Sequence, residues 1–143
     1  MEPITQFRGE YSFLSNFYPV EIERGGIIYP TLEHCYISEK TEDLNIREYI
    51  SSIPNPGKAK KYGSTIILRP NWNEDKINVM RELLLIKFGN EELLEKLLAT
   101  EGRDLIEGNA HGDRFWGQCP VGVGKNILGK LLMQIRETEL LFS

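Results

Sequence analysis

Apolar and polar residues alternate in two short runs near the start of the chain, Val20–Glu23 and Ile27–Tyr29. Alternation with a period of two is typical of a β-strand with one buried face. Between the runs, Gly25 and Gly26 can adopt the positive φ angles that a tight turn requires. The pattern predicts an antiparallel hairpin, and the aromatic and β-branched residues around it favour short strands throughout the first thirty residues.

Beyond the hairpin, apolar residues recur every three or four positions, which is typical of amphipathic helices. Side chains that can accept a first-turn N–H precede several of these stretches, as Thr31, Asn55, Asn71 and Asn90 do. We expect helices over Leu32–Lys40, Pro56–Tyr62, Trp72–Phe88, Glu91–Ala99 and Asn126–Thr138.

Weaker patterns indicate two further strands and a long loop. Short β-branched or apolar runs predict strands at Thr65–Leu68 and Leu105–Ile106, and glycines are frequent from Gly102 to Gly124. Long ordered loops often carry function. Together these elements predict an α+β fold that is predominantly helical, with a small N-terminal antiparallel sheet.

The length of 143 residues suits one core, since chains of about this size bury roughly two thirds of their unfolded surface. We therefore expect a single domain spanning residues 1–143. Composition excludes a disordered or low-complexity chain, with 41% hydrophobic and 27% charged residues. The net charge of −4 excludes a strong overall attraction for polyanions but leaves a local basic cleft open.

Cysteine use and hydropathy bear on the compartment. Two cysteines in a chain of this length do not predict a disulfide scaffold. The start has no signal-peptide pattern, and the longest strongly apolar run, Leu83–Ile86, is too short to cross a bilayer. We expect a cytoplasmic protein without membrane association.

Common cofactor and metal signatures are missing. Gly124-Lys125 is not a phosphate-binding loop, because Cys119 stands where that motif needs glycine and Asn126 where it needs a hydroxyl. The residues that could bind zinc lack the paired spacing of known sites; they are His34, Cys35, His111 and Cys119. We expect neither a metal nor a tightly held cofactor.

Glu33 and Lys40 are seven residues apart, which is nearly two helical turns. On one helix the carboxylate and the amine would share a face and could share a pocket. The alternative interpretation is a solvated helix face with unrelated charges.

The segment from Asp113 to Asn126 combines a carboxylate, aromatic rings and glycines ahead of a helix. Trp116 can stack on a base, Asp113 can bind hydroxyls, and backbone amides near Gly117 can bind phosphate oxygens. The alternative is that the rings close the core and the glycines only turn the chain.

Short blocks in compatible order along nearly the whole chain resemble the NADAR family, the YbiA-like group associated with NAD and ADP-ribose chemistry. They are Phe7-x-Gly9, Leu14-Ser15-Asn16-Phe17, Glu33-His34 with Lys40, Lys87-Phe88, Asp113-x-x-Trp116-Gly117, Gly124-x-Asn126-x-x-Gly129 and Leu132-Met133-x-x-Arg136. The resemblance implies a single α+β domain with N-glycosidase activity at a ribosyl carbon. Its substrate would be an early riboflavin intermediate, a ribosylaminopyrimidine phosphate, or guanine with ADP-ribose on its exocyclic amine.

The resemblance also implies roles for individual residues. Glu33 would transfer protons, Lys40 would act covalently or electrostatically at the anomeric carbon, and Asp113 would bind ribose hydroxyls or assist protonation. Residues expected to bind substrate are Asn16, Phe17, Trp72, Trp116, Gly117 and Asn126. For Trp72 a core anchor, and for Asn126 a helix cap, remain alternative interpretations.

Two other classes of function stay open. The chain could be a non-catalytic module that binds ADP-ribose or a related nucleotide. It could also be an interaction protein, or approach the phosphate backbone of a modified nucleic acid through the basic segment Lys58–Lys61, whose alternative interpretation is a solvated helix face. The segment between Glu107 and Asp113 departs from the family pattern, so substrate choice is expected to differ among relatives.

Overall fold

The computed structural model describes residues 1–142, and its contacts divide them into two compact units. One unit comprises residues 16–87, and the other comprises residues 1–15 together with the chain from residue 88 onward. Among the described residues there are seven helices and one two-stranded antiparallel sheet. The predicted α+β class, mainly helical with a small N-terminal sheet, is confirmed.

The sheet is the predicted hairpin of β1 (Pro19–Arg24) and β2 (Ile27–Thr31). The strands pair antiparallel, with Ile22 opposite Tyr29. Gly25 and Gly26 form the two-residue turn with φ angles of 60° and 81°. Positive φ at both turn positions matches the right-handed twist of the strands, which explains why two glycines stand here.

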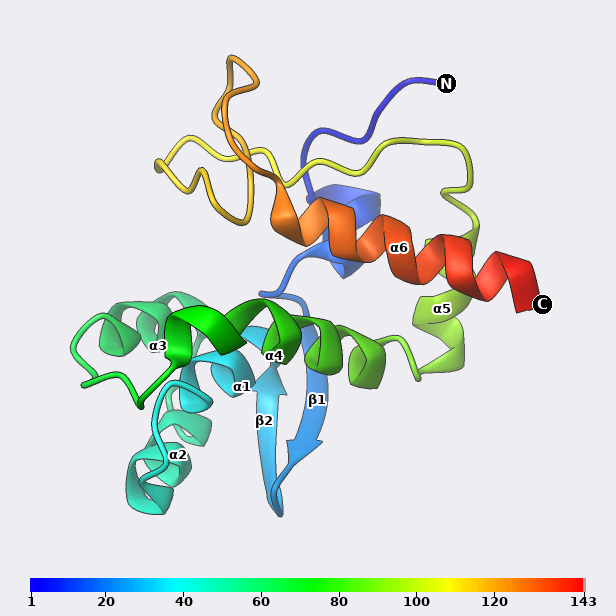
Figure 1. The fold of residues 1–143 in the computed structure, drawn as a ribbon. Coiled ribbons are helices and arrows are strands. Elements are labelled where there is room, and N and C mark those ends of the chain that lie inside the picture. The colour runs from blue at the N-terminus through cyan, green and yellow to red at the C-terminus, as the bar shows by residue number, and fades with distance from the viewer. Residues whose placement is uncertain (143) are drawn as a thin grey trace. The chain divides into compact units, whose positions relative to one another are not determined.

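Helix α1 (Leu32–Ser38) follows β2 directly (Figure 1). It begins where predicted, because the Thr31 hydroxyl oxygen accepts the backbone N–H of His34 at 3.2 Å. The helix ends at Ser38, so the prediction that it extends to Lys40 is wrong. Lys40 lies in the turn that follows, where its N–H donates to Ile37.

Helix α2 (Leu44–Ser51) was not predicted, although its start carries an ordinary signal. The Asp43 carboxylate accepts the N–H groups of Asn45 and Ile46 at 2.9 and 3.3 Å. Only Ile50 of this helix is buried, and the exposed apolar residues Leu44 and Tyr49 obscure its helical periodicity in the sequence.

Helix α3 (Pro56–Gly63) has the predicted cap, with Asn55 accepting the Lys58 N–H at 2.9 Å. Gly63 belongs to the helix, and a Cβ there would lie 2.7 Å from the side chain of Ile37. The glycine therefore lets α3 approach α1 closely. The predicted strand at Thr65–Leu68 is wrong, because the N–H groups of Thr65 and the next residue turn back to carbonyls of α3.

Helix α4 (Trp72–Lys87) has nearly the predicted bounds. Asn71 precedes it in the left-handed region, with φ of 64°, whereas a usual N-cap is extended. The Asn71 carbonyl accepts the N–H groups of Glu74 and Asp75. Met80 and Leu84 lie on the buried side of this helix.

The unit that contains both chain ends holds the remaining helices, η1 (Gly9–Leu14), α5 (Glu91–Leu98) and α6 (Ile127–Phe142). The 3-10 helix η1 replaces part of the strand structure expected in the first thirty residues. Leu105 forms a single bridge with Ile4, so the strand predicted at Leu105–Ile106 is reduced to one pair.

Candidate functional site

The predicted site residues divide between the two units. The unit of residues 16–87 contains Asn16, Phe17, Glu33, Lys40 and Trp72. The other unit contains Asp113, Trp116, Gly117 and Asn126.

The Glu33 carboxylate acts electrostatically on the Lys40 ammonium even though Lys40 lies beyond the end of α1. The pKa of the Lys40 ammonium lies below its ordinary value of 10.5, chiefly because burial disfavours the charged form. The Glu33 carboxylate acts in the opposite direction and raises that pKa. The side chain of Glu33 is itself buried. A partly desolvated amine therefore lies within electrostatic reach of a buried carboxylate.

Two further ammonium groups act on Lys40. Lys76 of α4 and Lys60 of α3 both lower its pKa by like-charge repulsion. Lys40 therefore loses its proton more readily than a lysine in water, which is the property that a nucleophilic amine requires.

Arg69 fixes the backbone that carries Lys40. Its N–H donates to the Lys40 carbonyl at 2.8 Å, and its Nε donates to the Glu39 carbonyl at 2.7 Å. The guanidinium is held in turn by the Asp75 carboxylate at 3.0 Å and lies 5.2 Å from the centre of the Trp72 ring. The position of the lysine thus depends on a residue from the segment just before α4.

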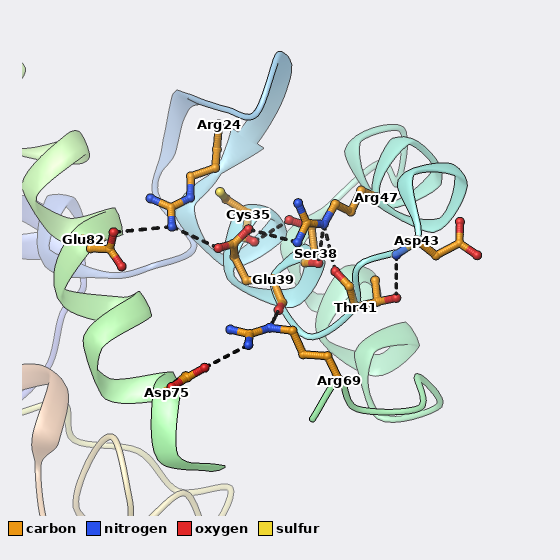
Figure 2. A network of polar contacts seen from close by, with 10 residues as sticks. All are labelled: Arg24, Cys35, Ser38, Glu39, Thr41, Asp43, Arg47, Arg69, Asp75 and Glu82. Atoms are coloured by element: carbon orange, nitrogen blue, oxygen red, sulfur yellow. Dashed lines mark hydrogen bonds and ion pairs between the residues drawn. The ribbon is translucent and has the colours of Figure 1, made fainter. Parts of the chain in front are cut away.

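The side chain of Arg47, on α2, hydrogen-bonds the first and the last residue of the segment 38–41 (Figure 2). Its Nε donates to the carbonyls of Ser38 and Thr41 at 3.2 and 2.9 Å. The buried Glu39 carboxylate pairs with Arg24 at 3.1 Å and with Arg47 at 3.6 Å. Four consecutive carbonyls, from residue 38 to residue 41, therefore accept hydrogen bonds from Arg47 or Arg69.

Asn16 carries an unsatisfied acceptor. The residue is 9% exposed, its carbonyl accepts the Glu33 N–H at 3.0 Å, and its Nδ2 contacts the Met80 sulfur at 3.6 Å. Among the described residues, its Oδ1 has no hydrogen-bond partner. A buried amide oxygen without a donor is costly, so this atom marks a place where a ligand donor would be stabilising. The neighbouring Phe17 is exposed.

Trp72 is buried at the start of α4 and packs against Tyr36 of α1, with ring centroids 5.3 Å apart. This contact fits the core-anchor interpretation of Trp72. It also brings the first turn of α4 against the helix that carries Glu33.

In the other unit, Asp113 organises its own loop. Its Oδ1 accepts the N–H groups of Phe115 and Trp116 at 3.1 and 2.9 Å. Such an aspartate turn orders the backbone without help from other elements. Asn109 adds a pair of hydrogen bonds to the Asp113 backbone. The half-buried Trp116 ring meets Phe115 edge-on, with centroids 4.8 Å apart.

Gly117 and Asn126 both lie against the backbone of Glu107, on the other side of the loop. A Cβ at Gly117 would collide with the Glu107 carbonyl oxygen, so the close backbone approach requires glycine here. The Asn126 side chain accepts the Glu107 N–H at 2.9 Å and donates to the Leu105 carbonyl at 2.9 Å. Both polar atoms of this buried amide are thus engaged with backbone.

Lys87 belongs to one of the blocks that resemble the NADAR family but was given no role in the site, and it is 1% exposed at the end of α4. Its ammonium lies 5.7 Å from the centre of the Tyr18 ring. The available signal was a lysine on the apolar stripe of the helix, seven residues after Met80. Buried lysines are rare, which makes Lys87 a further candidate for the site.

His34 and Cys35 are structural. The buried His34 ring bonds the Thr31 hydroxyl at 2.7 Å and the Ile53 carbonyl at 2.9 Å. Burial raises the pKa of the Cys35 thiol to about 12, so this cysteine stays protonated and inert. Within residues 1–142, no group of three or more His, Cys, Asp or Glu side chains is placed to hold a metal ion. None of the described helices is both long and apolar enough to span a membrane.

Comparisons with known proteins agree with the resemblance seen in the sequence. The family model described as the NADAR domain matches residues 5–139. The chain is 39% identical to the N-glycosidase YbiA of Escherichia coli over 131 residues, covering 90% of this chain and 81% of that protein. The NMR structure of E. coli YbiA superposes with a TM-score of 0.84 at 35% identity, covering 99% of this chain and 84% of that one.

A longer relative carries a different name. The chain is 35% identical over 130 residues to a riboflavin biosynthesis protein of Vibrio vulnificus. The match covers 89% of this chain but 35% of that protein, so the chain spans about a third of the relative's length.

Proposed function

The chain belongs to the NADAR domain family, and on this basis we propose that it is an N-glycosidase acting on the bond between a ribosyl carbon and an exocyclic nitrogen of a base. The observation that carries the proposal is the partly desolvated amine of Lys40 within electrostatic reach of the buried Glu33 carboxylate. Binding alone rarely requires a nucleophilic amine beside an acid, whereas one route for breaking this bond, through a lysine imine, uses both groups.

The chemistry uses the two groups in sequence. Transfer of the Lys40 ammonium proton to the Glu33 carboxylate gives a neutral amine beside a neutral acid. Glu33 gives this proton to the ring oxygen as the ribose ring opens to an iminium ion. The Lys40 amine then adds to the ribosyl carbon, Glu33 carries the proton lost by the Lys40 nitrogen to the nitrogen of the base, and the carbon–nitrogen bond to the base breaks. Water then adds to the resulting lysine imine while the Glu33 carboxylate accepts its proton, which releases the sugar aldehyde and restores Lys40. No step of this route draws on a metal.

The other predicted site residues divide into two roles. In the unit of residues 16–87, Asn16 would accept a donor from the base or sugar through its unsatisfied Oδ1, and Phe17 would offer a ring for stacking. In the other unit, Trp116 would offer a ring of its own. The contacts of Trp72, Asp113, Gly117 and Asn126 support positioning roles, in which Trp72 anchors α4 and the others shape the loop. The second Asp113 oxygen would bind ribose hydroxyls.

Two substrate classes contain the required linkage, namely ribosylaminopyrimidine phosphates and guanine modified with ADP-ribose on its amine. The name of the Vibrio relative points to the first. A direct test offers both substrates to the purified protein and identifies the released base by mass spectrometry. Wild-type protein should release the base from at least one of them, and Lys40→Ala and Glu33→Gln should lower the rate at least about 100-fold.

The control replaces a lysine outside the site. Lys58→Ala removes an exposed charge from α3 and should keep wild-type activity. Tight binding of ADP-ribose with no released base from either substrate would contradict the enzyme and identify a binding module instead.

A further inference from the structure

The chain places a second carboxylate next to the proposed nucleophile. Glu39 directly precedes Lys40, and its side chain is buried. Consecutive Cα atoms are about 3.8 Å apart, so an unbound carboxylate at this position could approach the Lys40 ammonium. It would favour the charged form of the lysine and compete with Glu33 for its proton. What the Glu39 carboxylate contacts therefore matters to the reaction.

Two arginines bind the two oxygens of the Glu39 carboxylate separately (Figure 2). Its Oε1 lies 3.1 Å from the guanidinium of Arg24, on β1, and its Oε2 lies 3.6 Å from that of Arg47, on α2. Each arginine is also held at a second point. Arg24 lies 3.7 Å from the Glu82 carboxylate of α4, and Arg47 hydrogen-bonds backbone carbonyls of the segment 38–41. Both oxygens of Glu39 are thus occupied by side chains from other elements.

Burial makes these two ion pairs necessary. A buried carboxylate is costly unless a positive charge lies against it. The other titratable side chains that interact with Glu39 are Tyr29 of β2 and Cys35 of α1, and burial raises the pKa of both, so neither is charged at neutral pH. Arginine keeps its charge over the whole accessible pH range. The guanidinium groups of Arg24 and Arg47 are therefore the charges that compensate this carboxylate.

We propose that Arg24 and Arg47 act as positioning residues by holding the Glu39 carboxylate away from the nucleophilic amine. Glu33 is then the acid that exchanges protons with Lys40. This inference rests on the proposed function and deepens it, because it assigns the proton transfers to one of two carboxylates close to the amine. The electrostatic action of Glu33 on the Lys40 ammonium supports the assignment.

The separation of the two carboxylates matters because the neutral amine is the form that attacks. A second carboxylate against the ammonium would lower the fraction of neutral Lys40 at a given pH. The other charged groups that act on Lys40 are Lys60 of α3 and Lys76 of α4. Neither belongs to β1 or α2, so a change at Arg24 leaves both lysines in place.

Competitive acetylation tests the proposal without substrate. Trace labelling with acetic anhydride over a pH series, followed by mass spectrometry of the peptide that contains Lys40, gives the pH at which half of this amine is neutral. Arg24→Met should raise this midpoint by about 0.5 pH unit, because one oxygen of Glu39 is released. The same shift should lower kcat/KM at neutral pH about 3-fold. Arg24 is a cleaner position for this test than Arg47, whose side chain also bonds the backbone of the segment.

The double variant Arg24→Met/Glu39→Gln separates this effect from the loss of a positive charge. It should restore the wild-type midpoint, because no carboxylate remains to be released. A midpoint that stays raised would show that Arg24 acts on Lys40 by repulsion alone and would overturn the proposal. So would a wild-type midpoint in Arg24→Met.

A second comparison does not depend on whether Arg24→Met folds. Glu39→Gln alone should move the midpoint less than Glu33→Gln does, since the charge of Glu39 is compensated by its arginines. An equal or larger shift in Glu39→Gln would place Glu39 against the amine and overturn the proposal.

The matched control is Glu82→Gln, which removes the other carboxylate bound to Arg24 and should keep the wild-type midpoint. Arg24→Lys keeps the positive charge beside Glu39 and should keep it too. Failure of the glycosidase proposal is a separate result, since it would show as absence of base release by wild-type protein while the labelling midpoints of the variants keep the expected order.

Discussion

The backbone N–H of Arg69 donates a hydrogen bond of 2.8 Å to the carbonyl oxygen of Lys40. The Arg69 side chain also bonds the preceding carbonyl, that of Glu39, so one residue secures two successive peptides at Lys40, the proposed nucleophile. A nucleophile must be held within a fraction of an ångström of its productive position. A lysine outside a helix needs such external support, because no intrahelical hydrogen bonds fix its backbone.

Arg69→Ala should lower kcat about 10-fold with a smaller change in KM, because it loosens the segment that positions Lys40 without removing a group that touches substrate. Steady-state kinetics measure this split. Arg81→Ala, which removes a half-buried arginine of α4 that hydrogen-bonds Asn78, is the control and should leave both constants near wild type. Unchanged kinetics in Arg69→Ala would show that the arginine is not a positioning residue.

The pH dependence of kcat/KM should report the deprotonation of Lys40. Since the pKa of Lys40 is lowered by burial and by like charges, the rising limb should have its midpoint below 10.5. Glu33→Gln removes a negative charge that raises this pKa, so the midpoint of its residual activity should move to lower pH. Lys76→Met removes a like charge, so its midpoint should move to higher pH.

The two opposite shifts are the diagnostic result. Glu92→Gln, at an exposed position of α5, should leave the midpoint unchanged. Movement of the midpoint in the same direction in Glu33→Gln and Lys76→Met would contradict the assignment of this limb to Lys40.

Local signals in the sequence predicted much of the fold. The hairpin, the Thr31 and Asn55 caps and the long helix α4 depend on interactions within a few residues, so the sequence displays them directly. The end of α1 was not predictable in this way. It depends on Arg69 and Arg47, whose hydrogen bonds to residues 38–41 come from outside the helix.

The sequence suggested which residue types belong to the candidate site, but not the distant residues whose hydrogen bonds and packing position them. The prediction that Glu33 and Lys40 share a face of one helix is wrong, because α1 ends at Ser38, although the Glu33 carboxylate still raises the pKa of Lys40. The engagement of both polar atoms of Asn126 with residues about twenty positions away has no local signature. The effect of Lys60 and Lys76 on Lys40 has no local signature either, because tertiary packing alone brings α3 and α4 to α1.

Asn126→Asp should lower the free energy of unfolding by about 1–3 kcal/mol, because it places a carboxylate oxygen against the Leu105 carbonyl in place of a donor. Urea denaturation measures the difference. Asn78→Asp on the exposed side of α4 keeps its acceptor for Arg81 and should change stability by less than about 0.5 kcal/mol. Wild-type stability in Asn126→Asp would show that the loop does not depend on this amide.

His34 should make the protein less stable in mild acid. Burial lowers the pKa of its ring below the ordinary 6.5, so below that pH the unfolded state binds more protons than the folded state. Stability should therefore fall as pH drops below 6.5, by at most about 1.4 kcal/mol per pH unit for this group. Urea denaturation at about pH 7.5 and about pH 5.5 should show a smaller difference in His34→Gln than in wild type.

The matched control for that experiment is the exposed loop residue, His111→Gln, which should keep the wild-type difference. An equal pH dependence in His34→Gln and wild type would assign the acid sensitivity to other groups.

Borohydride trapping tests the central claim most directly. Reducing the protein during turnover of either candidate substrate, followed by peptide mass mapping, should place a sugar adduct on the peptide that contains Lys40. Lys40→Ala should give neither adduct nor released base. Turnover in wild-type protein without an adduct, or an adduct confined to another lysine such as Lys87, would contradict the account.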